Sequence, residues 1–267
     1  MGYTNLIKMN SKNKAAKTDF LLERINQNEN FQAIDINKWA FEKLKASDQN
    51  LNILELCCGT GKQTKFLLEA FPNSIISCLD ISNDAINVVK KDNKDNVHRM
   101  KFFNNAIDDF FMENSRIYDL IFCSYGLYYS TNIDMVLSSI KKSLSVKGRF
   151  IVMGPYGKNN KQLFDLITRL NINIAKPVIH SSSQFMVEDV LTFVANNFEQ
   201  VHLYTTQNRI KWIDADSVVS YWKNSTFFEE SKKEDFALNV RDEIEKKNFF
   251  VNDKHIMLIE AINHDYV

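Results

Sequence analysis

The stretch from Leu51 to Thr64, LNILELCCGTGKQT, combines an acidic side chain with a glycine turn. An apolar run leads to Glu55. Two adjacent cysteines then precede Gly59 and Gly61. The chain has only seven glycines in 267 residues, so two of them one residue apart indicate a turn that needs bare backbone. A strand that enters such a turn before a helix can hold a polar or anionic ligand against backbone N–H groups.

Three classes of ligand use a turn of this kind, and the residue spacing separates them. A nucleoside triphosphate loop needs G-x-x-x-x-G-K-[ST], but Leu56 stands at the first glycine and Gln63 at the last position. A dinucleotide turn needs a third glycine where this chain has Thr64, and Glu55 would repel a pyrophosphate. S-adenosylmethionine has an ammonium group at its amino-acid end, so an acid at the end of the strand favours this third ligand.

The segment ELCCGTG resembles motif I of the class I S-adenosylmethionine-dependent methyltransferases, in which an acid and one further residue precede G-x-G-x-G. Glu55, Gly59 and Gly61 match the motif, and Cys57 replaces its first glycine. Because cysteine tolerates positive φ poorly, we expect a nearly extended backbone at Cys57. Taken alone, the turn could also be a strand–helix connection without a ligand.

The segment LDIS, at the end of the second predicted strand, is similar to the next motif of this family. Asp80 follows Gly59 at the spacing of a ribose-binding acid. The resemblance implies that the Asp80 carboxylate accepts both ribose hydroxyls of the cofactor and that Ile81 packs on its adenine. Taken alone, Asp80 could equally only cap the next helix.

Two further segments extend the resemblance over about residues 50–155. FFNNAIDDF resembles the family's acidic loop at the adenine amino group, with Asn105 at the usual Asp position, followed by Ala106 and Ile107. An Asn carbonyl can still accept a hydrogen bond from that amino group. YDLIFCSYGLYY resembles motif II, which implies that Cys123 offers its backbone carbonyl to the methionyl amine.

Aromatic and imidazole side chains after the later strands are candidates for the acceptor end of the site. The catalytic candidates are Tyr128, after the fourth strand, and His180, in the predicted loop VIHSSS before a helix. A general base is optional, because the methyl group of a sulfonium is already activated. The predicted substrate-binding residues are Tyr125, Tyr129, Tyr156, Tyr221 and Trp222. The alternative is that these aromatic side chains only pack against a core.

Apolar runs of strand length alternate with helix-like segments through the first part of the chain. The strands are NILEL, SIISCLD, VHRMKFF, YDLIFCS and RFIVMG, and the helices are Lys62–Ala70, Asn83–Lys91 and Ile133–Leu144. QVHLYTT and HIMLIEAI predict two later strands, the last one an antiparallel edge strand. We therefore predict an α/β fold with a doubly wound, seven-stranded, mostly parallel sheet.

The remaining segments are predicted to be helical. Four such helices cover residues 16–28, 34–46, 160–175 and about 184–197. We expect an N-terminal helical cap at residues 1–49 and a methyltransferase core domain at residues 50–267, with a helical lid insertion at about 210–250. The cap and the insertion would form a lid over the carboxyl edge of the sheet, where ligands bind in open α/β sheets.

Composition limits the expected partners and location. Lys+Arg and Asp+Glu both total 33, so net charge favours no nucleic-acid partner. The four cysteines form no C-x-x-C pair, and we expect reduced core thiols of a cytoplasmic protein and no metal site. No apolar run approaches 18 residues, so we expect no membrane segment. The expected assembly is a monomer or a homodimer.

The leading hypothesis is S-adenosylmethionine-dependent transfer of a methyl group, by in-line displacement, to an O or N atom of a small molecule. Sugars, quinones and secondary metabolites are the expected acceptor types. An RNA or protein methyltransferase is the first alternative, but CSYG lacks the prolines of the (N/D)-P-P-(Y/F) turn typical of base N-methylation. The others are a cofactor-binding protein without catalysis and, more distantly, a dehydrogenase.

Overall fold

The computed structural model describes residues 18–263, which form two compact units. Unit 1 comprises residues 18–36, 155–184 and 206–256. Unit 2 comprises residues 37–154, 185–205 and 257–263. The residues 1–17 of the predicted N-terminal cap lie outside the described part of the chain.

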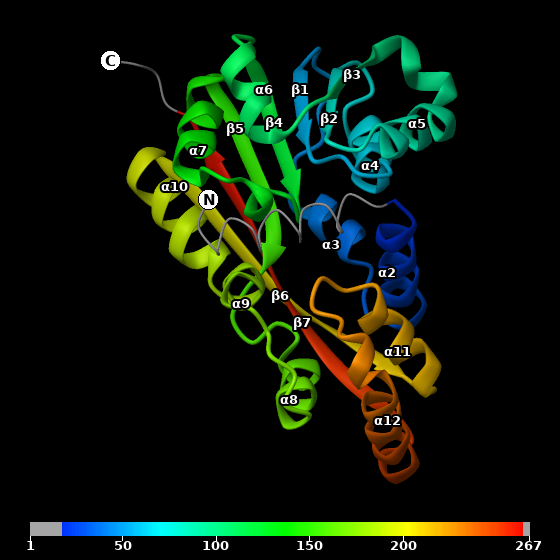
Figure 1. Cartoon of the computed structure of the whole chain (residues 1–267). Coiled ribbons are helices and arrows are strands. Elements are labelled where there is room, and N and C mark those ends of the chain that lie inside the picture. Colours follow the sequence, from blue (N-terminus) through cyan, green and yellow to red (C-terminus); the bar gives the residue numbers. More distant parts are fainter. Residues whose placement is uncertain (1–17, 264–267) are drawn as a thin grey trace. The chain divides into compact units, whose positions relative to one another are not determined.

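Seven strands form one sheet in the order β3-β2-β1-β4-β5-β7-β6 (Figure 1). The strands are β1 (Asn52–Leu56), β2 (Ile75–Asp80), β3 (Met100–Asn104), β4 (Tyr118–Ser124), β5 (Leu144–Pro155), β6 (Gln200–Trp212) and β7 (Phe250–Ile262). The first five strands pair in parallel. The predicted seven-stranded, mostly parallel sheet is therefore confirmed.

Strand β7 runs antiparallel to β5. The Lys147 amide donates to the Asn263 carbonyl, and the Tyr156 amide donates to the His255 carbonyl, so one strand ascends as the other descends. The antiparallel strand predicted for this end of the sheet is present, but β7 is second from the edge and β6 is outermost. This order follows from burial, because most residues of β7 are buried whereas the first half of β6 is largely exposed.

Short helices accompany the strands of unit 2. These are α3 (Ile36–Lys43), α4 (Lys62–Ala70), α5 (Asn83–Asp92), η1 (Lys94–Arg99), α6 (Ile107–Glu113), η2 (Leu127–Tyr129), α7 (Ile133–Lys142), η3 (Met186–Leu191) and α10 (Thr192–Asn197). Helix α5 packs on β2 and β3 (Figure 1) through an apolar face that includes Ile86 and Val89. The Ser82 side chain caps its first turn by accepting from the Ala85 amide.

Two segments predicted as loops are helical. Helix α9 (Lys176–Ser183) contains His180, and Pro177 lies in its first turn, where a missing N–H costs no hydrogen bond. Helix α6 occupies the segment predicted as the acidic loop. The helix predicted at about 184–197 is divided into the π-helix η3 and the α-helix α10.

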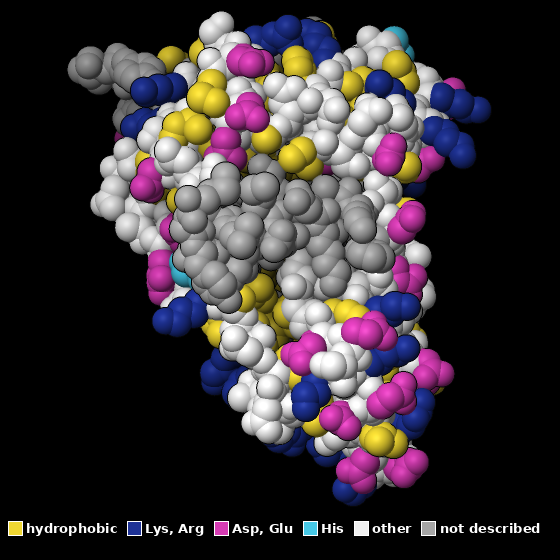
Figure 2. Space-filling view, viewed as in Figure 1, with side chains coloured by type: hydrophobic (Ala, Val, Ile, Leu, Met, Phe, Trp, Pro, Cys, Tyr) yellow, Lys and Arg dark blue, Asp and Glu magenta, His cyan; other side chains and the backbone are white. Residues whose placement is uncertain are grey.

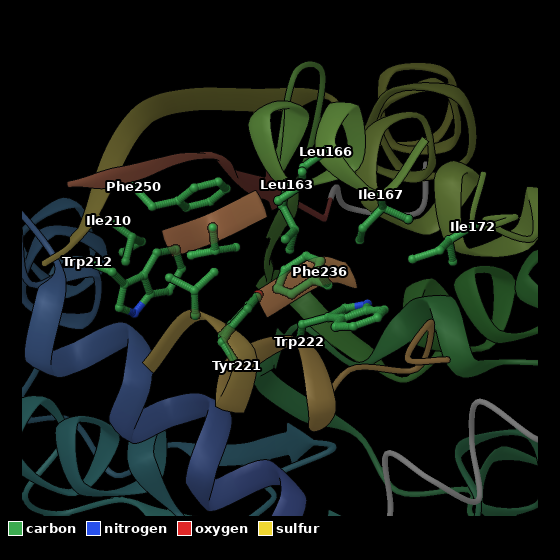
Figure 3. Packing of buried hydrophobic residues seen from close by; sticks show 12 residues of the cluster. Leu163, Leu166, Ile167, Ile172, Ile210, Trp212, Tyr221, Trp222, Phe236 and Phe250 are labelled. Carbon is green, nitrogen blue, oxygen red and sulfur yellow. The ribbon is translucent and has the colours of Figure 1, made fainter. Parts of the chain in front are cut away.

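The helices of unit 1 enclose an aromatic core. They are α2 (Thr18–Phe31), α8 (Lys161–Arg169), α9, α11 (Ala215–Lys223), η4 (Glu230–Lys232) and α12 (Lys233–Lys247). Figure 3 shows Trp212, Trp222, Phe236 and Phe250 gathered with aliphatic side chains of α8. The rings of Trp222 and Phe236 stack with their centroids 4.2 Å apart.

Helix α2 belongs to the same unit as the late insertion. The Ser220 hydroxyl of α11 donates to Glu23 of α2 at 2.8 Å, and Gln32 forms an antiparallel bridge with Ile210. Helix α2 and the insertion are therefore in contact, although they lie far apart in the sequence. Their closure over the site as a lid stays a prediction.

The surface of the described residues is mixed in charge. On the face that Figure 2 shows, Lys and Arg side chains are interspersed with Asp and Glu side chains. This pattern agrees with the equal totals of the two classes in the sequence. Among residues 18–263, no helix combines the length and the apolar character needed to cross a bilayer.

Candidate functional site

The turn between β1 and α4 contains three residues with positive φ. Gly59 and Gly61 have φ of 53° and 84°, which glycine adopts without strain. Cys57 has φ of 56°, so the extended backbone expected there is wrong. Non-glycine residues rarely adopt this conformation, and they keep it only where the surrounding structure enforces it.

Asp80 joins the end of β2 to this turn. Its Oδ2 accepts from the Gly59 amide and its Oδ1 accepts from the Ser82 amide, both at 2.8 Å. Burial raises the pKa of Asp80, although the Ser82 and Gly59 amides counteract part of that rise. Because Ser82 itself caps α5, capping is not the role of Asp80, and its carboxylate keeps acceptor capacity for a ligand beyond its bonds to backbone amides.

Glu55 lies beneath the turn and is 2% exposed. The Thr64 hydroxyl of α4 donates to its Oε2 at 2.6 Å, which joins β1 to the helix. Burial raises the pKa of Glu55 to about 8, against the Thr64 hydrogen bond and with a smaller contribution from the charge of Asp80. Glu55 is therefore largely protonated at pH 7, and the charge that we expected to face a ligand ammonium is not exposed.

The segment after Asp80 offers an apolar surface. Ile81 is 44% exposed directly beyond that carboxylate, as a side chain that packs on a planar ring must be. The side-chain amide of Asn104 donates to the carbonyls of Asp80 and Ile81 at 3.1 and 2.9 Å. Sequence reasoning selected Asn105 and missed Asn104, which the parallel pairing of β2 and β3 places beside Asp80.

The start of α6 is more buried than the loop that was expected. Ala106 precedes the helix with an extended backbone, whereas Ile107 is 5% exposed, so its side chain belongs to the core. Asp108, which sequence reasoning also missed, accepts from the Ser130 hydroxyl at 2.7 Å and from the Asn132 amide at 3.2 Å. Its signal in the sequence is the acidic pair in the first turn of a helix.

The end of β4 carries strain and an unsatisfied hydroxyl. Cys123 is fully buried, so only its backbone can serve the role predicted for it. The Ser124 hydroxyl is buried with no hydrogen-bond partner among the described residues. Tyr125 has φ of 55°, is 37% exposed, and donates its amide to the Met153 carbonyl at 2.9 Å. Strained backbone and orphaned polar groups of this kind gather at ligand sites.

The acceptor candidates are distributed over both units. In unit 2, the ring of Tyr128 lies 4.7 Å from that of Tyr129 and meets Phe185 edge-on at 5.8 Å. Tyr128 and Tyr129 are half-buried and follow the exposed Tyr125 in the segment after β4. Tyr156 and His180 belong to unit 1, and His180 lies on α9 rather than in the predicted loop.

The two candidates from the late insertion belong to the core. Trp222 is fully buried against Phe236 (Figure 3), so its side chain has no surface for a substrate. Tyr221 is 8% exposed, and its hydroxyl accepts from the Lys254 ammonium. Their prediction as substrate-binding residues is wrong, because the aromatic stripe of α11 packs inward.

The cysteines form no disulfide, and three of them are buried core thiols, as predicted. Cys57 differs because it is partly exposed in the turn. Within residues 18–263, no group of three or more His, Cys, Asp or Glu side chains is arranged to hold a metal ion.

Comparison with known proteins finds a family model and relatives that this chain resembles. Residues 53–148 match a family model described as a methyltransferase domain. A malonyl-[acyl-carrier protein] O-methyltransferase of Ilyobacter polytropus is 27% identical over 267 aligned positions, which cover 90% of this chain and 95% of that protein.

Solved structures share the fold at low identity. The YcgJ protein of Bacillus subtilis is 14% identical, with a TM-score of 0.56 over 86% of this chain and 97% of that one. The N-methyltransferase NodS of Bradyrhizobium japonicum, in complex with S-adenosylhomocysteine, is 13% identical, with a TM-score of 0.52 over 86% of each chain. The family match thus assigns residues 53–148 to a methyltransferase domain, and the glycine turn, Asp80 and the sheet order resemble those of the class I S-adenosylmethionine-dependent methyltransferases.

Proposed function

We propose that this methyltransferase acts on an oxygen atom of a small acidic acyl group, with the free carboxylate of a malonyl thioester on an acyl carrier protein as the first candidate. The observation that carries this proposal is the extent of the likeness to the Ilyobacter enzyme. The methyltransferase domain match ends at residue 148, whereas that likeness extends over nearly the whole of both chains. It therefore includes segments outside the methyltransferase domain match, and we assign acceptor specificity to those segments.

The residues of unit 2 fit the cofactor. The Asp80 carboxylate can accept from the ribose, and the exposed side chain of Ile81 can cover the adenine. The backbone at Gly59 and Gly61 can approach the amino-acid end, because neither residue has a Cβ. The orphaned Ser124 hydroxyl supplies one further hydrogen bond for a ligand at the end of β4.

A carboxylate acceptor suits the side chains that the site offers. Bound S-adenosylmethionine supplies an electrophilic methyl group on a positively charged sulfur. A carboxyl group is already ionised at pH 7, so no residue has to remove a proton before the oxygen attacks. Tyr128 and its neighbours would then hold the acceptor in line and exclude water, and such positioning can contribute about 7–11 kcal/mol to lowering the barrier.

Calorimetry with S-adenosylmethionine and S-adenosylhomocysteine tests the cofactor site. We expect micromolar binding of both, weakened at least tenfold by Asp80→Ala because the ribose loses its acceptor. Asp84→Ala is the matched control, since this acid is exposed in the first turn of α5. An unchanged affinity in Asp80→Ala would refute the ribose role, and binding of NAD instead would overturn the class.

Mass spectrometry of two carrier-bound thioesters tests the acceptor. A malonyl thioester should gain one methyl group, about 14 Da, whereas an acetyl thioester, which lacks the free carboxyl group, should stay unmodified. Methylation of neither, in a protein that binds S-adenosylmethionine, would overturn the carboxylate proposal. Methylation of an amine or hydroxyl acceptor would then support the broader small-molecule hypothesis, and no turnover with any acceptor class would support a binding protein without catalysis.

A further inference from the structure

We propose that Gly126 is a positioning residue for the cofactor turn and that its lack of a side chain compensates for the cysteine at position 57. A Cβ on Gly126 would lie 2.3 Å from the Cβ of Cys57 and 2.6 Å from its Sγ. Real Cβ atoms do not approach other atoms this closely, so the turn would have to move. The Cys57 side chain therefore occupies the space that Gly126 leaves.

The backbone of Gly126 gives no other reason for a glycine. Its φ of −125° and ψ of −33° lie outside the left-handed region, so other residues can adopt φ of this sign. Positive φ occurs instead at its contact Cys57 and at its chain neighbour Tyr125. The constraint at Gly126 is thus steric, and its two shortest contacts are with Cys57.

This contact joins the two loops that bear on the cofactor's amino-acid end. Cys57 follows β1 and Gly126 follows β4, and these strands are neighbours in which Leu56 pairs with Cys123. The Sγ of Cys123 would lie 3.3 Å from a Cβ at position 126, so that side also lacks room for a larger residue. The fit of Cys57 against Gly126 sets the separation of the loops, and a displaced turn would move the amides of Gly59 and Gly61.

A double-mutant cycle read by S-adenosylhomocysteine affinity tests this coupling. Gly126→Ala should weaken binding at least tenfold when Cys57 is present and less than threefold in the Cys57→Gly background, because the clash is then removed. Equal losses in both backgrounds, or no loss in either, would overturn the proposal. Rescue by Cys57→Gly is the result that a merely destabilising effect of alanine at position 126 would not produce.

Gly154→Ala is the matched control. A Cβ there would lie 2.8 Å from the Sδ of Met186, so this variant also introduces a steric conflict, but not with the turn. Its melting temperature should fall equally in both backgrounds, and its ligand affinity should stay within twofold of the parent.

This inference rests on the cofactor role proposed for the turn. Melting temperatures distinguish a failure of the Gly126–Cys57 contact from a failure of the proposed function. If the parent protein bound no S-adenosylhomocysteine, the proposed function would fail. Gly126→Ala should still lower the melting temperature less in the Cys57→Gly background than in the presence of Cys57. An equal decrease in both backgrounds would show that Gly126 and Cys57 are not in steric contact.

Discussion

The two units differ in the kind of residue that adopts positive φ. Among the described residues of unit 1, the non-glycine residues are Asn160, Asn171 and Asn248, each near the end of a helix. In unit 2 they are Cys57, Tyr125 and Lys147. Asparagine is the side chain type that tolerates this conformation well, whereas cysteine and tyrosine do not.

This difference distinguishes asparagines that adopt positive φ at helix termini from residues whose backbone is strained at the candidate cofactor site. In unit 1 asparagine, which suits this conformation, lies beside helix termini, before α8 at Asn160 and after α12 at Asn248. In unit 2, Cys57 and Tyr125 lie at the ends of the neighbouring strands β1 and β4, where the cofactor motifs lie, whereas Lys147 lies within β5. Such strain persists only where surrounding contacts enforce it, and it gathers where ligands bind. The cost at Cys57 and Tyr125 therefore indicates function rather than stability.

Each unit has its own hydrophobic core, and Leu54, Phe122 and Phe150 are fully buried in unit 2. The core of unit 1 is aromatic and aliphatic, with Trp212, Trp222 and Phe236 at its centre (Figure 3). Unit 2 buries the titratable Glu55 beside Asp80 beneath the turn. We infer that large losses of stability can come from the core of either unit, whereas direct losses of ligand affinity will come from unit 2.

The largest expected effect is that of Phe236→Ala. The side chain is fully buried against Trp222, so its removal should lower the free energy of unfolding by about 3–5 kcal/mol. Leu238→Ala, on the same helix but 59% exposed, should cost less than about 0.5 kcal/mol. Denaturant unfolding measures both. A weakened S-adenosylhomocysteine affinity in folded Phe236→Ala would break the division of roles between the units.

Glu55→Gln should change how stability depends on pH. Burial raises the pKa of Glu55 from 4.5 in the unfolded chain to about 8, so the folded state keeps a proton that the unfolded state releases. Its contribution is complete below pH 4.5 and is lost as pH rises through about 8, by at most about 1.4 kcal/mol per pH unit. The glutamine variant should lack this fall, and it keeps an acceptor for Thr64.

Unfolding measured at several pH values between 5 and 8 checks this expectation. Glu69→Gln is the control, because this acid is exposed on α4. A Glu55→Gln protein with the parent's pH dependence would show that the buried carboxyl does not titrate in this range.

A smaller effect is expected from Ser124→Ala. An unsatisfied buried hydroxyl costs about 1–3 kcal/mol, so its removal should leave the free energy of unfolding unchanged or raise it by about 1 kcal/mol. Ser130→Ala should instead destabilise the protein, because the Ser130 hydroxyl donates to buried Asp108. Parallel denaturant titrations compare the two serines. Equal destabilisation would mean that the Ser124 hydroxyl has a partner and is not reserved for a ligand.

The smallest effect tests helix capping in unit 1. Asn248 ends α12 with φ of 65°, so Asn248→Gly should raise the free energy of unfolding by about 0.5–1 kcal/mol. Asn239→Gly makes the same change inside α12 and should lower it by some tenths of a kcal/mol, since glycine disfavours helix interiors. Thermal melts of the pair give the sign. Destabilisation by both would show that the asparagine side chain itself stabilises the cap.

Local signals predicted much of the fold. The helix at Lys62–Ala70 has the predicted bounds, and the first, second and fourth strands follow their apolar runs closely. The Pro177 signal for α9 was present but was interpreted as a loop. For the site, the glycine turn and Asp80 were recognisable because their residue types and spacing are local properties.

The sequence by itself determined the alternation of strands and helices. It also determined the motif from which the cofactor was predicted. These depend on hydrophobic period and turn chemistry within a few neighbouring residues. Only the tertiary structure decided the left-handed backbone at Cys57, the space for its side chain at Gly126, the raised pKa of Glu55 and the inward packing of Trp222. Each of these depends on burial or steric contact between segments far apart in the chain, which no local pattern records.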